Sequence, residues 1–190
     1  MWIFYRVTVV VILLLPWKGE AAVYMLGGPQ DVPREGQEFE VKIGIDTEGE
    51  RINVVDVALP LPPAFQLIGF NRASSAVNLW IQEPAYDEAT HTVSFIGGVP
   101  GGVAGRVVLL TMRLRSIQDG RFALRPSADS KAYLNDGRGS EASVRAEELL
   151  IEVDDGITER LRKAGAWILG ILTIIVSGMV TVKLWHKKKV

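Results

Sequence analysis

The residue types that most often carry out catalysis are scarce in this sequence. It contains 190 residues, no cysteine and only two histidines, His91 and His186. Without cysteine there can be no disulfide, no thiolate nucleophile and no cysteine-based zinc site. His186 lies in a basic tail and His91 in a turn-like segment, so the central region holds one histidine. This argues against a catalytic triad and against a histidine-based zinc site.

Paired carboxylates are another way to build a hydrolytic site. A glycosidase needs two carboxyl groups about 5–9.5 Å apart across a cleft. The acidic pairs here fall in turns or on the polar side of alternating segments, which is typical of solvated charges. These pairs are Glu38/Glu40, Glu48/Glu50, Asp87/Glu88 and Glu147/Glu148. We therefore predict no catalytic residue and no enzyme activity.

Two segments could be taken for ligand-binding loops. Asp129, Asn135 and Asp136 offer oxygen ligands for calcium, but their spacing does not match the D-x-[DN]-x-[DN]-G loop. The run Asn135-Asp136-Gly137 is more simply a turn, because Asn and Gly tolerate positive φ. Residues 96–105, IGGVPGGVAG, lack the G-K-[ST] ending of a phosphate loop, and we interpret them as a flexible crossover between sheets. The sequence thus predicts neither a metal nor a cofactor.

Two aromatic residues are candidates for binding a polysaccharide. Trp80 and Tyr86 lie around a predicted edge strand, NLWIQEPAY. Exposed rings on a sheet could stack on a sugar. The alternative, which the sequence favours, is that Trp80 packs over the edge of the sheet.

Four arginines are candidates for binding an acidic partner. Arg113 and Arg115 lie on one predicted strand, and Arg121 and Arg125 lie on the next. If these two strands pair, the four guanidinium groups share one face that could receive an acidic surface. A solvated face without a partner is the simpler interpretation.

The elements that must position these residues are predicted to be strands. Apolar residues alternate with polar ones in several segments, which places one face on a core and the other in water. The clearest examples are Phe39-Val41-Ile43-Ile45, Val55-Val57-Leu59, Val108-Leu110-Met112-Leu114 and Phe122-Leu124. Further strands are predicted at 22–25, 66–70, 77–82, 92–95, 130–134 and 148–153. About nine short strands separated by turns indicate an all-β fold, a nine-stranded jelly-roll β-sandwich over residues 22–154.

The two ends of the chain are strongly apolar. Residues 1–21 have a basic start, an apolar run of about 11 residues and small residues at 19 and 21, as a cleaved signal peptide does. Residues 164–184 begin with about 19 uncharged residues, long enough for a transmembrane helix. A juxtamembrane segment at 155–163 precedes this helix, and a basic cytoplasmic tail at 185–190 follows it. We expect a single-pass cell-membrane protein whose N-terminal domain is extracellular.

The charge of the central domain limits its partners. Residues 22–154 contain 12 basic and 19 acidic residues, a net charge of −7. Because binding to phosphates needs a basic surface, nucleic acid is not expected as a partner.

The order of these segments resembles the cohesin domain. One matching stretch is GQEFEVKIGIDTEGERINVVDVALPLPPAFQLIGF, residues 36–70, with an opening Gly, an alternating strand, a turn and a Pro-containing loop. The other is residues 92–140, with a Gly-rich crossover, a long strand and the ending AYLNDGRG. The resemblance implies a sandwich related in fold to carbohydrate-binding modules, and a dockerin-like protein as partner. A carbohydrate-binding module and a structural envelope protein without a dissociable ligand are the alternatives.

Overall fold

The computed structural model describes residues 21–156 of the chain. These residues form eleven strands, rather than the nine of the predicted jelly roll, and no helix. The strands are β1 (Ala22–Gly27), β2 (Glu38–Asp46), β3 (Ile52–Pro60), β4 (Phe65–Asn71), β5 (Leu79–Asp87), β6 (Thr92–Val103), β7 (Arg106–Ser116), β8 (Gly120–Leu124), β9 (Lys131–Leu134), β10 (Val144–Ala146) and β11 (Leu149–Val153). Within this part of the chain no helix is long and apolar enough to cross a bilayer. The predicted signal peptide, transmembrane helix and tail lie outside the described residues, apart from Ala21.

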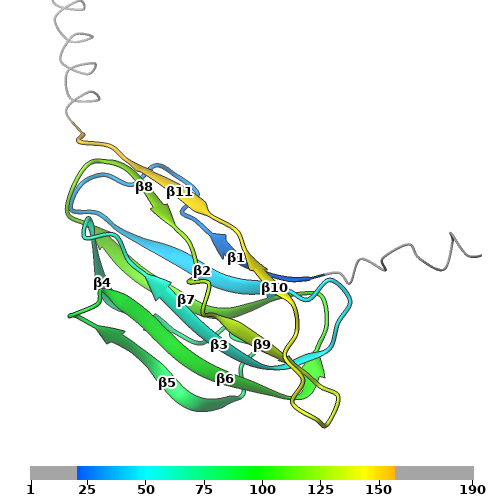
Figure 1. Ribbon diagram of the computed structural model, residues 1–190. Coiled ribbons are helices and arrows are strands. Elements are labelled where there is room, and N and C mark those ends of the chain that lie inside the picture. Colours follow the sequence, from blue (N-terminus) through cyan, green and yellow to red (C-terminus); the bar gives the residue numbers. More distant parts are fainter. Residues whose placement is uncertain (1–20, 157–190) are drawn as a thin grey trace, which may run out of the picture.

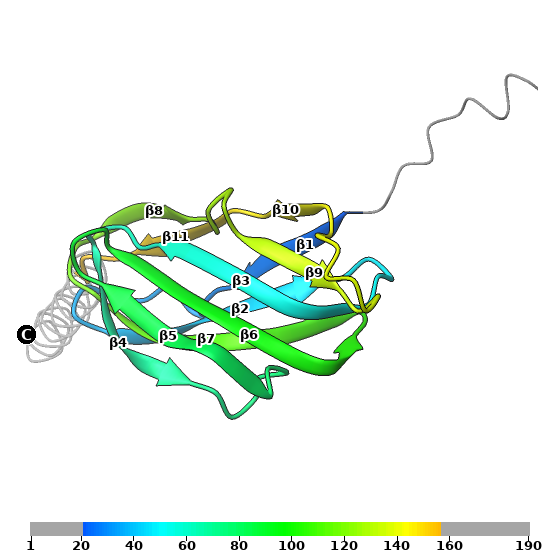
Figure 2. The ribbon, with the colours of Figure 1, turned by 60° about the horizontal axis from the view of Figure 1, so that its bottom comes forward.

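Two sheets pack face to face in a β-sandwich (Figure 1, Figure 2). The first has the strand order β10-β1-β2-β7-β4, and the second has the order β5-β6-β3-β9. Neighbours pair antiparallel except β1 and β10, which run parallel. A two-stranded ribbon of β8 and β11 covers one end of the sandwich. The predicted all-β sandwich is confirmed.

The alternation in the sequence explains which side chains form the core. Val41 and Ile43 of β2 and Val57 of β3 are completely buried, whereas Glu40 and Lys42, which alternate with the buried residues of β2, are exposed. The inward residues of both sheets form one hydrophobic cluster. Tyr24 of β1 is buried in it, and its hydroxyl donates a hydrogen bond to the Lys131 carbonyl, 2.6 Å away. This bond links the two sheets, and burial raises the pKa of Tyr24.

The glycine-rich segment 96–105 is mostly strand, so its interpretation as a flexible crossover is wrong. Strand β6 runs through it to Val103, and only residues 104 and 105 cross to the other sheet. Gly97 makes this packing possible, because a Cβ there would lie 2.8 Å from both methyl groups of Val77. Val77 is buried. The glycine removes bulk where another segment packs against the strand.

The strand pairing also differs from the sequence-based hypothesis for the arginines. Strand β7 does not pair with β8, because β2 and β4 already occupy its two edges. Strand β8 instead pairs with β11 at the end of the sandwich. The condition under which four arginines would share one face is therefore not met.

Candidate functional site

The outer face of the four-stranded sheet is sparsely charged. One row of paired residues crosses it from Leu79 of β5 through Gly98 of β6 and Val54 of β3 to Tyr133 of β9. Their inward neighbours on β3, β6 and β9 are Val55, Gly97 and Ala132, all buried. The row itself therefore points outward, and Leu79 is 55 % exposed. It forms an apolar strip across the sheet.

The next row along the sheet carries the charges of this face. It joins Gln82, Ile96, Asp56 and Lys131 on the same four strands. Gln82 lies 3.4 Å from the Ser94 hydroxyl, and Lys131 forms an ion pair with Glu141 at 3.1 Å. That carboxylate raises the pKa of Lys131. We call the outward residues of these two rows, together with the neighbouring Ile81, the apolar face.

Ile81 extends the apolar face along the open edge of β5. Its side chain is 57 % exposed, at a point where the register of β5 against β6 shifts. Leu79 and Ile81 are two of the five exposed large hydrophobic residues of the described chain. An edge strand with exposed apolar side chains can pair with another chain. Single exposed apolar residues are normal on a protein surface, whereas a cluster of them marks a site of interaction.

The outer face of the five-stranded sheet is different in character. Glu38 of β2 lies opposite Arg115 of β7, and Glu40 lies opposite Arg113. Arg115 forms an ion pair with Glu38, and the Arg113 guanidinium lies 3.6 Å from the same carboxylate. Two of the predicted binding arginines are thus occupied by an acidic residue on the neighbouring strand. The carboxylate pair Glu38/Glu40 belongs to this solvated face.

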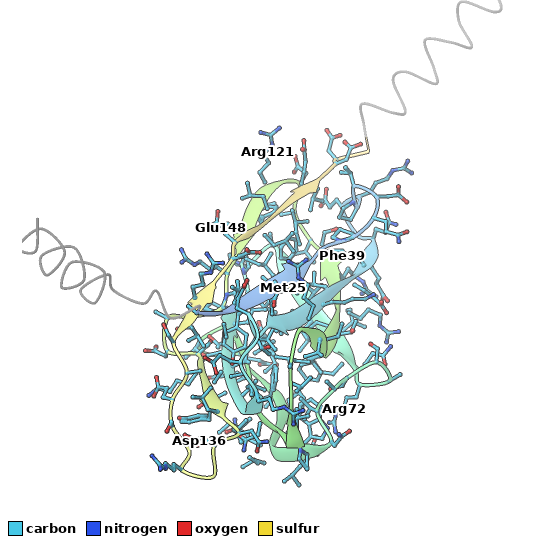
Figure 3. All side chains as sticks on the ribbon, turned by 90° about the vertical axis from the view of Figure 1, so that its right-hand side faces the viewer. Met25, Phe39, Arg72, Arg121, Asp136 and Glu148 are labelled. Carbon is cyan, nitrogen blue, oxygen red and sulfur yellow. The ribbon has the colours of Figure 1, made fainter. Side chains whose placement is uncertain are left out.

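The other two predicted arginines lie on the β8 side of the molecule. Arg121 is 3.6 Å from Glu152 of β11, and Figure 3 shows it at the end of the domain opposite Asp136. Arg125 follows β8 and lines a groove beside β10. The structure thus separates the four arginines into three places.

Trp80 and Tyr86 turn toward the core side of β5. The Trp80 ring meets Phe95 edge-to-face at 5.7 Å, and the Arg72 guanidinium lies 4.9 Å from its centroid. Trp80 therefore packs over the sheet edge, as the favoured interpretation has it. The Tyr86 hydroxyl lies 2.8 Å from His91 Nδ1 in the β5–β6 hairpin. Neither ring lies free on the outer face for stacking, and sugar binding by these two residues stays a prediction.

The turns hold the remaining polar candidates. Asp136 Oδ1 accepts hydrogen bonds from the Arg138 and Gly139 N–H groups at 2.8 and 3.1 Å, so the turn interpretation is confirmed. Asp129 is bonded to Ser127 in another turn. Backbone and hydroxyl bonds from Ala89 and Thr90 lower the pKa of Asp87. No group of three potential metal ligands occurs among residues 21–156.

The outward apolar residues were missed as candidates, although the signal was present. Once Val55, Val57 and Leu59 are assigned to the core, alternation places Val54 on the outer face. The sequence does not reveal that Val54 has Gly98 and Tyr133 beside it, because those neighbours come from strands distant in the chain.

Comparison with known proteins was made by sequence and by structure. No family model and no curated protein matches the sequence. Among solved structures, a non-cellulosomal cohesin from Archaeoglobus fulgidus matches with a TM-score of 0.58 and 12% identity, covering 70% of this chain and 91% of that one. A cohesin module of a Clostridium perfringens family 33 glycoside hydrolase gives a TM-score of 0.56 and 12% identity, with 70% and 98% covered. The domain has a cohesin-like fold.

A further cohesin-fold neighbour was solved together with its partner. The third ScaB cohesin of R. flavefaciens, in complex with a group 1 dockerin, matches with a TM-score of 0.55 and 17% identity over 73% of this chain and 98% of that one. At these identities the likeness to cohesins concerns the fold. It confirms the resemblance found in the sequence at the level of the fold.

Proposed function

We propose that this chain is a non-catalytic cohesin-like module that captures a dockerin-like protein on its apolar face. Solved neighbours of the same fold are in complex with dockerins. Their partner is carried over to this chain as a hypothesis. The choice of surface rests on this molecule alone.

The apolar strip formed by Leu79, Gly98, Val54 and Tyr133 is the observation that supports this choice. Gly98 has no side chain and is itself buried next to Leu79, so the strip is low in the middle and higher at Leu79 and Tyr133. Burial of apolar surface is the dominant favourable contribution to most protein–protein association. Tyr133, which has Val54 on one side and Glu141 on the other, is of a residue type that often dominates binding energy.

The charges beside this strip would set the orientation of the partner. Asp56 and Lys131 lie next to each other in the second row, one negative and one positive. Charged groups around an apolar centre contribute mainly to association rate and specificity. A partner with complementary charges at the same spacing would therefore be selected over other apolar surfaces.

The module would be displayed outside the cell on a membrane anchor. The signal peptide predicted at 1–21 and the helix predicted at 164–184 support this location, which remains part of the proposal. The described domain ends at residue 156, so about seven residues would separate it from the bilayer. Such a short connection would hold the apolar face close to the cell surface.

Binding can be tested with the full chain in detergent micelles. Dockerins of the kinds crystallised with the neighbours serve as probes, measured by calorimetry. We expect saturable binding by at least one of them, and a loss of about 100-fold in Leu79→Asp/Tyr133→Ala. The matched control is Gln66→Asp, an exposed residue of β4 on the other sheet, which should bind normally.

Two results would contradict the proposal. If no dockerin binds, the partner class is wrong. If one binds and the Leu79→Asp/Tyr133→Ala protein binds it equally well, the partner class is right but the surface is wrong. Thermal unfolding of each variant establishes that the comparison is made between folded proteins.

A further inference from the structure

A groove on another side of the sandwich is not explained by the proposed partner. Its volume is about 570 Å³, within the range of small ligand sites. Residues 125–130, which lead from β8 to β9, form one wall, and β10 forms the other. None of the apolar-face residues named above lines it. Strands β10 and β9 are edge strands of different sheets, and they lie near each other in Figure 2.

The inside of the groove is held in place by hydrogen bonds. Tyr24 lines it, and its hydroxyl is fixed to the Lys131 carbonyl at 2.6 Å. Pro126 is buried, and Val144 and Ala146 of β10 are half-buried. The opposite wall is tied to the sheet, because the Ser127 N–H donates to the Ala58 carbonyl at 2.7 Å. The groove therefore exists before any ligand binds.

The rim of the groove is positively charged. Arg125 and Arg145 line it from opposite walls. The Arg125 side chain has no ion pair or hydrogen bond with any residue from 21 to 156, and the Arg145 guanidinium has only a loose ion pair with Glu48 at 3.9 Å. Asp129, on the same wall as Arg125, is engaged by the Ser127 hydroxyl at 3.2 Å. The Arg125 guanidinium is thus available to an incoming anionic group, and the Arg145 guanidinium becomes available when its loose ion pair with Glu48 opens.

The edge of β10 is open toward a further strand. Strand β10 ends the order of its sheet, and it pairs only with β1. The Ser143 carbonyl and the Glu147 N–H bond to β1. Because main-chain groups of successive residues point to opposite edges, those of Val144 and Ala146 point away from β1. An extended backbone lying in the groove could bond to them, as in β-strand addition.

We propose that this groove binds a short extended peptide segment that carries acidic side chains. The segment adds as a strand beside β10, and its carboxylates pair with Arg125 and Arg145. Strand β10 has three residues, so about 10 Å of peptide would be paired at 3.3 Å per residue. The same arginines could attract a phosphate, but the open main-chain edge favours a peptide.

The test is selection of peptides from a random heptapeptide display library on the full chain in detergent micelles. Binders should be enriched in Asp and Glu, and a synthetic copy should bind at least 10-fold more weakly to Arg125→Glu/Arg145→Glu. The milder Arg125→Gln variant should lose part of the affinity, which guards against a misfolded double variant. N-methylation of alternate peptide amides should also weaken binding, because it removes backbone donors.

Other outcomes would overturn this inference. These are the absence of any binder, binders without acidic enrichment, or binding that is equal in the arginine variants. The Leu79→Asp/Tyr133→Ala protein should select and bind the same peptides. Peptides that lose binding in that protein would belong to the apolar face instead, so the two proposals can fail separately.

Discussion

Both outer faces of the sandwich consist of strands with alternating inward and outward residues, but the outward residues of the two faces differ in kind. On the five-stranded sheet, outward positions of β2 and β7 are charged and satisfy one another, as Glu38 does with Arg113 and Arg115. On the four-stranded sheet, the corresponding row holds Leu79, Gly98, Val54 and Tyr133. Ion-paired charges keep a surface hydrated, whereas an apolar strip gains free energy when covered. The comparison supports the choice of the four-stranded sheet as the proposed binding face.

The largest expected effect is on partner affinity, and it comes from making the same glycine-to-glutamate substitution on each face. Gly98 of β6 and Gly69 of β4 both lie at outward positions, one on each sheet, and neither has positive φ. A Cβ at Gly98 would make only ordinary contact with Leu79, and one at Gly69 would meet nothing within 4 Å. Gly98→Glu should weaken partner binding at least 100-fold, because it buries a carboxylate at the centre of the interface.

Gly69→Glu is the matched control for that substitution and should leave affinity unchanged. Calorimetry with the bound dockerin gives both values, and thermal unfolding checks that both proteins fold. Equal loss of affinity in the two variants would mean that the faces do not differ in function.

The next effect concerns stability and contrasts the two sides of a single strand. Gly97→Ala would place a Cβ 2.8 Å from both methyl groups of Val77. Val77 has little room to move, since Ser75 beside it is bonded to the Leu109 carbonyl at 2.6 Å and Ala76 to the Val108 carbonyl at 2.8 Å. Overpacking of this kind costs about 1–3 kcal/mol. Urea unfolding of the full chain should report that loss.

Gly98→Ala, one residue further along β6, provides the comparison for Gly97→Ala. Its Cβ points to the outer face, where the nearest atom is Leu79 Cβ at 3.4 Å. We expect its stability to stay within about 0.5 kcal/mol of the parent. If both alanine substitutions lower the free energy of unfolding equally, the two sides of β6 do not differ in packing.

The sequence predicted the sides of the strands better than their neighbours. Alternation identified Val41, Ile43 and Val57 as core residues, because period two is a local property. It could not place Tyr133 beside Val54, since that pairing is decided by the packing of the whole sheet. Short spacing made β7 and β8 look like a hairpin, but occupied edges on β7 direct β8 to β11.

The sequence did not predict the glycine-rich segment or the shortest strand correctly. The glycines of 96–105 suggested a flexible loop, whereas Gly97 serves close packing inside a strand. Strand β10 was not predicted, because three residues are too few for a periodic pattern. The groove beside β10 therefore could not be foreseen, and Arg125 was grouped with the wrong arginines.

The smallest expected effect is on the charged face. Glu38→Gln removes the carboxylate shared by Arg113 and Arg115 but keeps the shape of the side chain. All three side chains are more than a third exposed, and exposed ion pairs contribute about 0–1 kcal/mol. Urea unfolding should therefore show a loss of about 0.5 kcal/mol at low salt, which becomes smaller at 1 M salt as the charges are screened.

Partner affinity should not respond to Glu38→Gln, because the charged face takes no part in the proposed complex. A stability loss above about 2 kcal/mol would show that this network supports the fold. A loss of affinity would show that the partner also touches the five-stranded sheet. A surface whose charges are already ion-paired gains little free energy when a partner covers it. Either result would therefore contradict the distinction between a hydrated face and a binding face.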